Sequence, residues 1–348
     1  KRAITEANAL GVTLEIALHL SDNAQQELSA LRVLLSELQP PVVTWLIFHQ
    51  KEKVTTPGWV TMARQTLADY SPATPIGAGT NIYFTELNSR RPSAEALAVM
   101  DVVAWSINPQ VHAFDNSSLV ETLAAQAVTA TSARQFCGDR PLLVTPITLQ
   151  PRFNPNATGP EPEPKAGELP PQVDPRQMSL FGAGWTLGSI KQLAQSGAVS
   201  SLTYYETTGW RGVMERSSGS PLPEKFQSIA GAVFPLYHVF ADVGEFAGGE
   251  VLTCKSQAEL SVEALVLHKD GRTRILLANF TASPQQVMLQ GINGTTARVR
   301  LLDERNVEQA MRSPTTFQQR IGSSRSVTDG KLRVELLPFA LARIDLES

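Results

Sequence analysis

Apolar positions recur with two different periods along the first 250 residues. Short runs rich in β-branched and aromatic residues predict strands, and apolar residues at helical spacing predict helices between them. The predicted strands cover residues 12–20, 42–48, 75–86, 102–107, 142–149 and about 200–206. The predicted helices cover residues 1–10, 21–38, 57–70, 93–100, 117–136, 177–196 and 222–246. This alternation indicates a parallel sheet with helical crossovers.

The predicted strands are short and end in polar or aromatic residues, which favours a (β/α)8 barrel over an open sheet. No Gly-x-Gly-x-x-Gly turn follows any of them, so a dinucleotide-binding sheet is disfavoured. A barrel needs eight strand–helix units, and the pattern contains six. Because the last unit has the character of a barrel's end, we expect two units upstream of residue 1, so that the chain runs from the third strand to the eighth.

Residues 151–176 interrupt the alternation with eight prolines and no apolar periodicity. A loop of this length is either a functional lid or disordered. Because it follows a predicted strand end, we predict a lid over the active site.

The pattern changes again at about residue 249, where turns begin to recur about every ten residues, the spacing of a β-sandwich. Lys269-Asp270-Gly271 is a typical hairpin turn, and no helical pattern of comparable strength is present. We therefore predict a catalytic barrel domain over residues 1–248 and a structural β-sandwich over 249–348. The predicted strands of the sandwich cover residues 251–254, 262–268, 274–280, 286–289, 298–302, 331–336 and 340–344.

The composition of the chain argues against some classes of binding partner. The chain has 348 residues, 42% of them hydrophobic, a net charge of −3 and no long basic run, which argues against nucleic acid. No apolar stretch is long enough to cross a membrane. Cys137 and Cys254 are too far apart for a disulfide framework or zinc motif, and as unrelated thiols they favour a reducing, cytoplasmic location. The oligomeric state is left open.

Two glutamates are the main candidates for catalysis. Residues 77–88 and 200–212 each read as a strand leading into a polar segment, with Glu86 in the first and Glu206 in the second. Barrels carry their chemistry at the carboxyl ends of their strands, so the two side chains can converge. One would then act as an acid, and the other as a base or nucleophile. The structural alternative is that each glutamate caps a helix or pairs with a nearby arginine.

The loop at residues 108–116 supplies a second candidate set. His112 and Asp115 can form an acid/base pair, since an imidazole exchanges protons near neutral pH. A loop histidine bonded to backbone is the alternative. His49 holds a similar position at the end of the strand over 42–48.

Basic and amide side chains near these glutamates are candidates for binding substrate. Arg152 and Arg211 each follow a predicted strand, and either can bind a carboxylate product or an oxyanion, with Arg211 the better placed. Asn81 and Asn88 flank Glu86 and extend the candidate site.

Aromatic residues suggest a wall for a sugar ring, although isolated aromatics more often belong to a core. No Gly-x-Ser-x-Gly elbow is present, which disfavours a serine hydrolase. No His-x-x-x-His or clustered His/Asp set indicates a metal, so no cofactor is expected, although strand-end carboxylates could hold an ion. The aromatic candidates are Tyr83, Tyr204, Tyr205 and Trp210.

Three phrases resemble the D-apionate lactonase family of bacterial sugar catabolism: GTNIYFTELN at 79–88, VHAFD at 111–115 and YYETTGWRG at 204–212. The resemblance covers most of the chain, as the later part of a longer family member, and implies hydrolysis of D-apionolactone to D-apionate. On this hypothesis Glu86 or Glu206 activates water as a general base. His112 protonates the leaving oxygen or shares that work with the other glutamate. The oxyanion would be steadied by Arg211 and Asn81.

A barrel with strand-end glutamates followed by a β-sandwich also resembles the retaining glycosidases. Residues 143–147 read LVTPI, with proline where the seventh strand of those enzymes often carries its nucleophile. A different strand count places Glu86 and Glu206 on strands four and seven, as acid/base and nucleophile. The alternatives are therefore a retaining glycoside hydrolase and a non-catalytic carbohydrate-binding protein.

Overall fold

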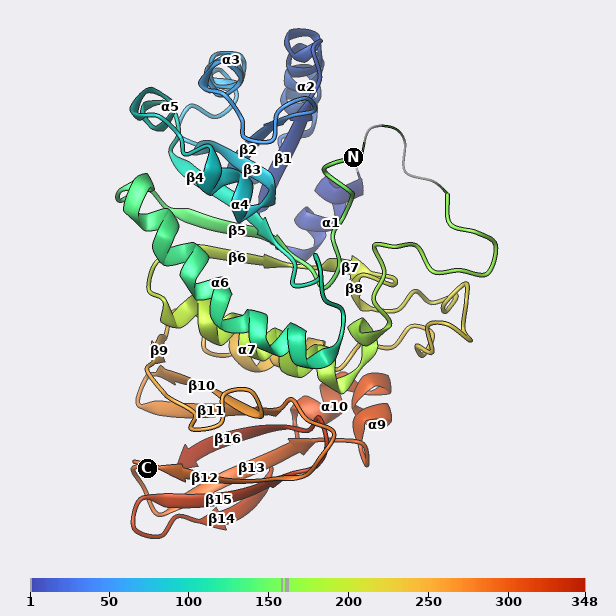
Figure 1. Cartoon of the computed structure of the whole chain (residues 1–348), viewed down its shortest axis with the longest axis vertical. Coiled ribbons are helices and arrows are strands. Elements are labelled where there is room, and N and C mark those ends of the chain that lie inside the picture. Colours follow the sequence, from blue (N-terminus) through green and yellow to red (C-terminus); the bar gives the residue numbers. More distant parts are fainter. Residues whose placement is uncertain (1, 158, 160–162, 348) are drawn as a thin grey trace. The chain divides into compact units, whose positions relative to one another are not determined.

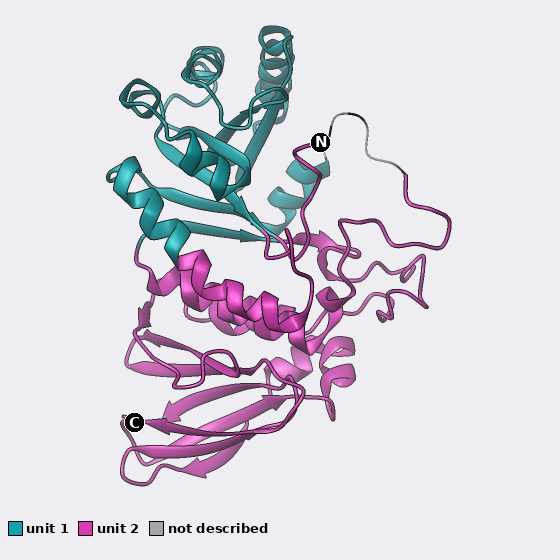
Figure 2. Cartoon of the chain, in the orientation of Figure 1, with its two compact units in different colours: residues 1–107, 128–147, 198–204 teal, residues 108–127, 148–197, 205–348 magenta. Residues whose placement is uncertain are grey.

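The computed structural model describes residues 2–157, 159 and 163–347. The chain forms two compact units that are interleaved in sequence (Figure 2). Unit 1 comprises residues 1–107, 128–147 and 198–204, and unit 2 comprises residues 108–127, 148–197 and 205–348. The predicted domain boundary after residue 248 stays a prediction.

Unit 1 is built on a parallel half-barrel sheet of six strands in chain order (Figure 1). All six were predicted from the sequence, as was the alternation with helices. The strands are β1 (Leu14–Leu20), β2 (Val42–His49), β3 (Ile76–Tyr83), β4 (Val102–Ile107), β5 (Leu142–Ile147) and β6 (Ser201–Tyr204). The intervening helices are α2 (Ala24–Leu38), α3 (Pro57–Leu67), α4 (Phe84–Ser89), α5 (Ala94–Ala98) and α6 (Asn116–Cys137), with α1 (Arg2–Leu10) before β1.

Strand β2 illustrates why a continuous apolar run forms a central strand. Trp45 and Ile47 pack in a cluster with apolar residues of α2 and α3. Leu46 and Phe48 belong to a second cluster, with residues of β4 and β5. Successive side chains point to opposite faces, and both faces are buried from Trp45 to Phe48, so these four positions are all apolar. Figure 1 shows α2, α3 and α5 along one side of this sheet.

Strand β3 approaches β4 closely because its sequence contains glycine. Gly79 has a φ of +141°, and a Cβ built on it would lie 2.2 Å from the carbonyl oxygen of Ala104. A side chain at this position would force the two strands apart, which explains a glycine inside a buried strand.

Strand β3 is also shorter than predicted, which corrects the placement of Glu86. The strand ends at Tyr83, and the next residues form α4, so Glu86 lies in the first turn of a helix and not at a strand end. Leu87 is fully buried, which anchors this turn, and a carboxylate near a helix N-terminus is favourable.

Unit 2 contains a buried helix, α7 (Leu180–Gln195), preceded by the 3-10 turn η1 (Pro175–Met178). The ammonium of Lys191 in α7 donates to the Glu263 carboxylate at 2.9 Å, and both side chains are buried. Gly188 faces Phe280 and Leu123, and a Cβ built on it would lie 2.7 Å from the Leu123 side chain, which would have to shift. Helix α7 therefore packs directly against the first strands of the β-sandwich.

The predicted helix over residues 222–246 is wrong in its first half. Only α8 (Leu236–Gly244) is helical, and Val233 instead forms an antiparallel bridge with Met214. Pro235 is the N-cap residue of α8, a position where the missing N–H of proline removes no helical hydrogen bond.

The C-terminal region forms the predicted β-sandwich. Apolar residues of a six-stranded and a two-stranded antiparallel sheet share one core. The larger sheet consists of β14 (Ser323–Ser326), β13 (Thr296–Leu302), β16 (Leu341–Glu347), β11 (Arg272–Asn279), β10 (Val262–Lys269) and β9 (Glu250–Leu252). In the smaller sheet, β12 (Gln285–Gln290) pairs with β15 (Lys331–Leu336). Two short helices, α9 (Val307–Arg312) and α10 (Pro314–Gln318), and the polar edge strand β14 were not predicted.

None of the helices in the described ranges combines the length and the apolar character needed to cross a membrane.

His238 in α8 is held in its neutral form by contacts with both α9 and α10. Its Nε2 donates to the carbonyl of Ala310 at 3.2 Å, and its Nδ1 accepts from the Gln318 amide at 3.0 Å. Burial lowers the pKa of His238 to about 4, and the positive charge of Arg300 acts in the same direction.

This burial predicts a loss of stability in acid. The unfolded chain binds a proton at His238 below pH about 6.5, whereas the folded chain does so only below about 4, so falling pH favours unfolding across that window. Between pH 7 and pH 5 the loss at this site should be about 2 kcal/mol. Urea unfolding of wild type and His238→Gln at both pH values measures it. The variant should lack this part of the pH dependence. An equal change in the free energy of unfolding between pH 7 and pH 5 for the two proteins would contradict a buried, neutral His238.

Candidate functional site

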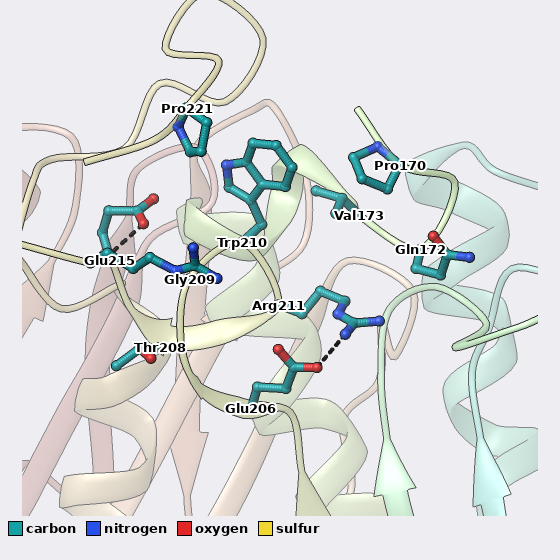
Figure 3. A pocket seen from close by; sticks show the side chains of 11 residues that line it. Pro170, Gln172, Val173, Glu206, Thr208, Gly209, Trp210, Arg211, Glu215 and Pro221 are labelled. Atoms are coloured by element: carbon teal, nitrogen blue, oxygen red, sulfur yellow. Dashed lines mark hydrogen bonds and ion pairs between the residues drawn. The ribbon is translucent and has the colours of Figure 1, made fainter. Parts of the chain in front are cut away.

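A cavity of about 250 Å³ lies in unit 2 where the chain leaves β6. It combines charged, aromatic and proline side chains, and Figure 3 shows how they surround it. It is lined by Pro170, Gln172, Val173, Glu206, Thr208, Gly209, Trp210, Arg211, Glu215, Arg216 and Pro221.

A small two-stranded parallel sheet positions the charged groups of this cavity. Strand β7 (Glu206–Thr208) pairs with β8 (Gly212–Met214), and Gly209, with a φ of +90°, forms the turn between them. Tyr205 separates β6 from β7 with a φ of +52°, so Glu206 begins a new strand and does not end β6. The buried Tyr205 hydroxyl bonds to that of Thr186 at 2.8 Å, which holds this unusual backbone in place.

Glu206 and Arg211 face each other across the two-stranded sheet. A guanidinium nitrogen of Arg211 lies 2.5 Å from Oε1 of Glu206, and the backbone N–H of Glu206 donates to the Arg211 carbonyl at 2.9 Å. The Glu206 side chain is 52% exposed, so a water or ligand can reach the carboxylate. The pairing predicted as the structural alternative is therefore present, but inside a cavity (Figure 3).

Arg152 adds positive charge near Arg211. Burial lowers the pKa of the Arg152 guanidinium, and the charge of Arg211 lowers it further. Two neighbouring cations repel one another, so an anionic group bound between them would be stabilised. Arg152 also lies over the ring of Phe153, 5.6 Å from its centroid.

Trp210 forms an aromatic wall of the cavity. Its indole N–H donates to the Ser220 hydroxyl at 2.9 Å, and its ring lies 6.4 Å from that of the buried Phe226. These contacts fix the orientation of the indole. Tyr205, proposed for the same wall, is instead buried in the core.

Two residues of the cavity were not found from the sequence. Glu215 directly follows β8 and is 1% exposed, and Arg216 is an exposed residue of the cavity lining. The segment Val213-Met214-Glu215-Arg216 has the apolar-then-charged pattern of a strand end, which could have drawn attention to both. The short length of β8 concealed that signal.

The loop predicted as a lid contributes Pro170, Gln172 and Val173 to the lining. Residues 158 and 160–162 of that loop lie outside the described part of the chain. The contact supports a role for the loop at this cavity, and closure over a ligand stays a prediction.

The other glutamate and several binding candidates belong to unit 1. The Glu86 carboxylate accepts from the ammonium of Lys53 at 3.1 Å and is 21% exposed. The Asn88 side chain is exposed and accepts two bonds from Arg91. The remaining candidates of unit 1 are Asn81 and Tyr83 in β3, where burial raises the pKa of Tyr83, and Tyr204 in β6. All of these roles stay predictions.

The loop at 108–116 is held in unit 2 by an internal network. The Gln110 amide donates to the buried Asp174 carboxylate at 2.5 Å, and Arg176 donates to the Phe114 carbonyl at 2.9 Å. His112 is exposed on this loop. Asp115 accepts from the backbone N–H and the hydroxyl of Ser118, at 3.0 and 2.7 Å, as a cap for α6.

The capping geometry predicts a structural effect of Asp115→Ala. Losing this cap should lower the free energy of unfolding by about 1 kcal/mol, because an N-terminal N–H of α6 loses its acceptor. The hydrogen bonds to Ser118 lower the pKa of Asp115, which fits an ionised cap. Urea unfolding measures the loss, with Asp115→Asn as a control that keeps an acceptor. A collapse of turnover with unchanged stability would instead assign Asp115 to the chemistry.

In the described ranges, no group of three or more His, Cys, Asp or Glu side chains is arranged to hold a metal ion.

Two family profiles match the chain. One, described as D-apionate lactonase, TIM barrel domain, matches residues 1–248, and the other, described as D-apionate lactonase, C-terminal immunoglobulin-like domain, matches residues 259–344. The D-apionate lactonase of Brucella anthropi is 28% identical over 219 residues, which are 63% of this chain and 34% of that protein. The chain thus spans about a third of the length of this curated relative.

Solved structures of glycosidases share the fold. The family 51 α-L-arabinofuranosidase AbfB of Bifidobacterium longum has a TM-score of 0.62 and 13% identity, covering 100% of this chain and 78% of that one. The α-L-arabinofuranosidase of Thermotoga maritima has a TM-score of 0.60 and 13% identity. The match covers 99% of this chain and 78% of that one. At such low identity the likeness concerns the fold alone.

Proposed function

The chain belongs to the D-apionate lactonase family, and on that premise we propose that it hydrolyses a small sugar lactone, D-apionolactone, to the open acid D-apionate. The observation that carries the proposal is the pairing of Glu206 with Arg211 in a cavity walled by Trp210. Such a cavity offers a base, a cation and an apolar ring face to one small ligand.

The proposed chemistry places the lactone carbonyl beside Arg211. Glu206 takes a proton from a water molecule as its oxygen attacks the carbonyl carbon. Negative charge then develops on the carbonyl oxygen, where the Arg211 guanidinium stabilises it. The ring carbon–oxygen bond breaks, the leaving oxygen takes a proton, and the acid remains. His112, in the same unit as the cavity, is the proposed source of that proton.

The product is a carboxylate, and the basic side chains suit it. Arg152 and Arg211 lie close enough for their charges to interact, and Arg216 lines the same cavity as Arg211. A guanidinium binds a carboxylate through two parallel hydrogen bonds. We propose that these arginines hold the acid before it leaves.

The test is hydrolysis of D-apionolactone by the longest available form of the protein, followed by acid release, beside a panel of aryl glycosides. The proposal predicts acid release and no glycoside cleavage. Glycoside cleavage without lactone turnover would favour a retaining glycosidase, with Glu86 as acid/base and Glu206 as nucleophile. Inactivity on both, with a folded protein, would favour a carbohydrate-binding role.

A further inference from the structure

Glu215 is a buried carboxylate in the wall of the same cavity. The residue is 1% exposed, and it lines the cavity together with Trp210 and Pro221. Figure 3 shows the carboxylate on the side of the Trp210 indole, away from the Glu206–Arg211 pair. The proposed chemistry does not use it, so its presence in the wall needs another explanation.

The known partners of this carboxylate are both uncharged. The backbone N–H of Arg216 donates to Oε1 at 2.8 Å, and the Ser228 hydroxyl donates to Oε2. No lysine, arginine or histidine among the described residues forms an ion pair with Glu215. A buried charge is costly without a cation or a full set of hydrogen bonds. An ionised carboxylate accepts at about four positions, and two are used here, so acceptor capacity is left for a ligand.

The charges around Glu215 decide what kind of ligand group fits. Arg211 and Arg216 line the cavity, and the other carboxylate there, Glu206, is already paired with Arg211, so the charge of Arg216 would repel a cationic ligand. Glu215 itself would repel a carboxylate. A neutral hydroxyl group avoids both repulsions and supplies the O–H donor that the free acceptor positions need. Trp210 beside it offers a flat apolar surface to the ring that bears the hydroxyl.

We propose that Glu215 is a substrate-binding residue that accepts hydrogen bonds from the hydroxyl groups of the sugar lactone and thereby determines specificity for a hydroxylated ring. This inference rests on the proposed function. It also fixes an orientation: the hydroxyl-bearing edge lies toward Glu215, and the lactone carbonyl lies toward Arg211. A site built around a substrate hydroxyl discriminates strongly against analogues that lack it.

Glu215→Gln is a closely matched test. The glutamine carbonyl can still accept from the Arg216 N–H, and its amide can donate to Ser228, because a hydroxyl both donates and accepts. The variant therefore keeps the local bonds and loses the charge and part of the acceptor capacity. Glu224→Gln, an exposed carboxylate of the same segment outside the cavity lining, is the control.

Binding is measured by NMR titration in a Glu206→Gln background, so that the lactone is not consumed, with D-apionolactone and with γ-butyrolactone, which lacks ring hydroxyls. We expect Glu215→Gln to weaken D-apionolactone binding about 10-fold to 100-fold, the range for a hydrogen bond to a charged group. Binding of γ-butyrolactone should change by less than about twofold. Glu224→Gln should change neither.

Equal weakening of both ligands, no weakening of D-apionolactone, or no binding of it at all would overturn the inference. Should the glutamine variant not fold, deoxy lactones that lack one hydroxyl each give the same test with Glu215 in place, and at least one should bind about 10-fold more weakly. Failure of the proposed function looks different: wild type would bind the hydroxylated lactone, with the Glu215 dependence intact, and release no acid.

Discussion

Replacing Glu206 by glutamine is expected to lower kcat/KM for lactone hydrolysis by about 10²–10⁴-fold, the contribution of a general base. Glutamine keeps the size of the side chain and can still accept a bond from Arg211, but it cannot take a proton from water. Because the base acts in the transition state, kcat should fall by a similar factor and KM should change little. Initial rates of acid release over a range of substrate concentrations measure both.

Stability separates this loss from unfolding. The Glu206–Arg211 pair is half-exposed, and such pairs contribute about 1 kcal/mol or less, so Glu206→Gln should melt close to wild type. Glu86→Gln is the matched catalytic comparison, since that carboxylate also pairs with a cation, Lys53. Full activity of the Glu206→Gln variant together with loss of activity in Glu86→Gln would show that the general base is Glu86 in unit 1.

The largest stability effect is expected at Asp242, in the centre of a buried charge network of unit 2. Its carboxylate accepts from Arg300 at 2.6 Å and from Arg343 at 3.0 Å, and all three side chains are largely buried. Asp242→Ala leaves two buried cations without this partner. Breaking a buried pair from one side costs about 3–5 kcal/mol, and we expect a loss of that size in the free energy of unfolding.

Urea unfolding measures the Asp242 effect, and the chain provides its own control. Glu308 and Arg312 form an exposed pair one helical turn apart, so Glu308→Ala should cost about 0.5 kcal/mol or less. An Asp242→Ala protein within about 1 kcal/mol of wild type would contradict the account of this network, since the two arginines would then have found other partners or solvent.

The strands of the half-barrel were predictable because their pattern is local. Trp45 to Phe48 are apolar at every position, and such a run has few alternatives to a central strand. The helix at 222–246 failed for the opposite reason. The bridge between Val233 and Met214 is a contact between distant residues, and it decides the conformation before Pro235 regardless of local propensity.

The candidate site was predictable only in part. Glu206, Trp210 and Arg211 lie within six residues, so their common location in one cavity could be inferred from a single stretch of sequence. Glu215 belongs to the same wall because β7 and β8 pair side by side, and the apolar-then-charged pattern of residues 213–216 is too short to reveal that pairing. Asp115 caps α6 through Ser118, a structural role that the sequence pattern before a helix also allowed, and its role toward a substrate stays a prediction.

We propose that the lactone reacts in the cavity that holds Glu206 and Arg211. The most direct measurement is a crystal structure of the Glu206→Gln variant with D-apionolactone. We predict the lactone ring against Trp210, its carbonyl oxygen within hydrogen-bond distance of Arg211, and its hydroxyl groups toward Glu215. A well-ordered lactone bound elsewhere, with this cavity empty, would contradict the account.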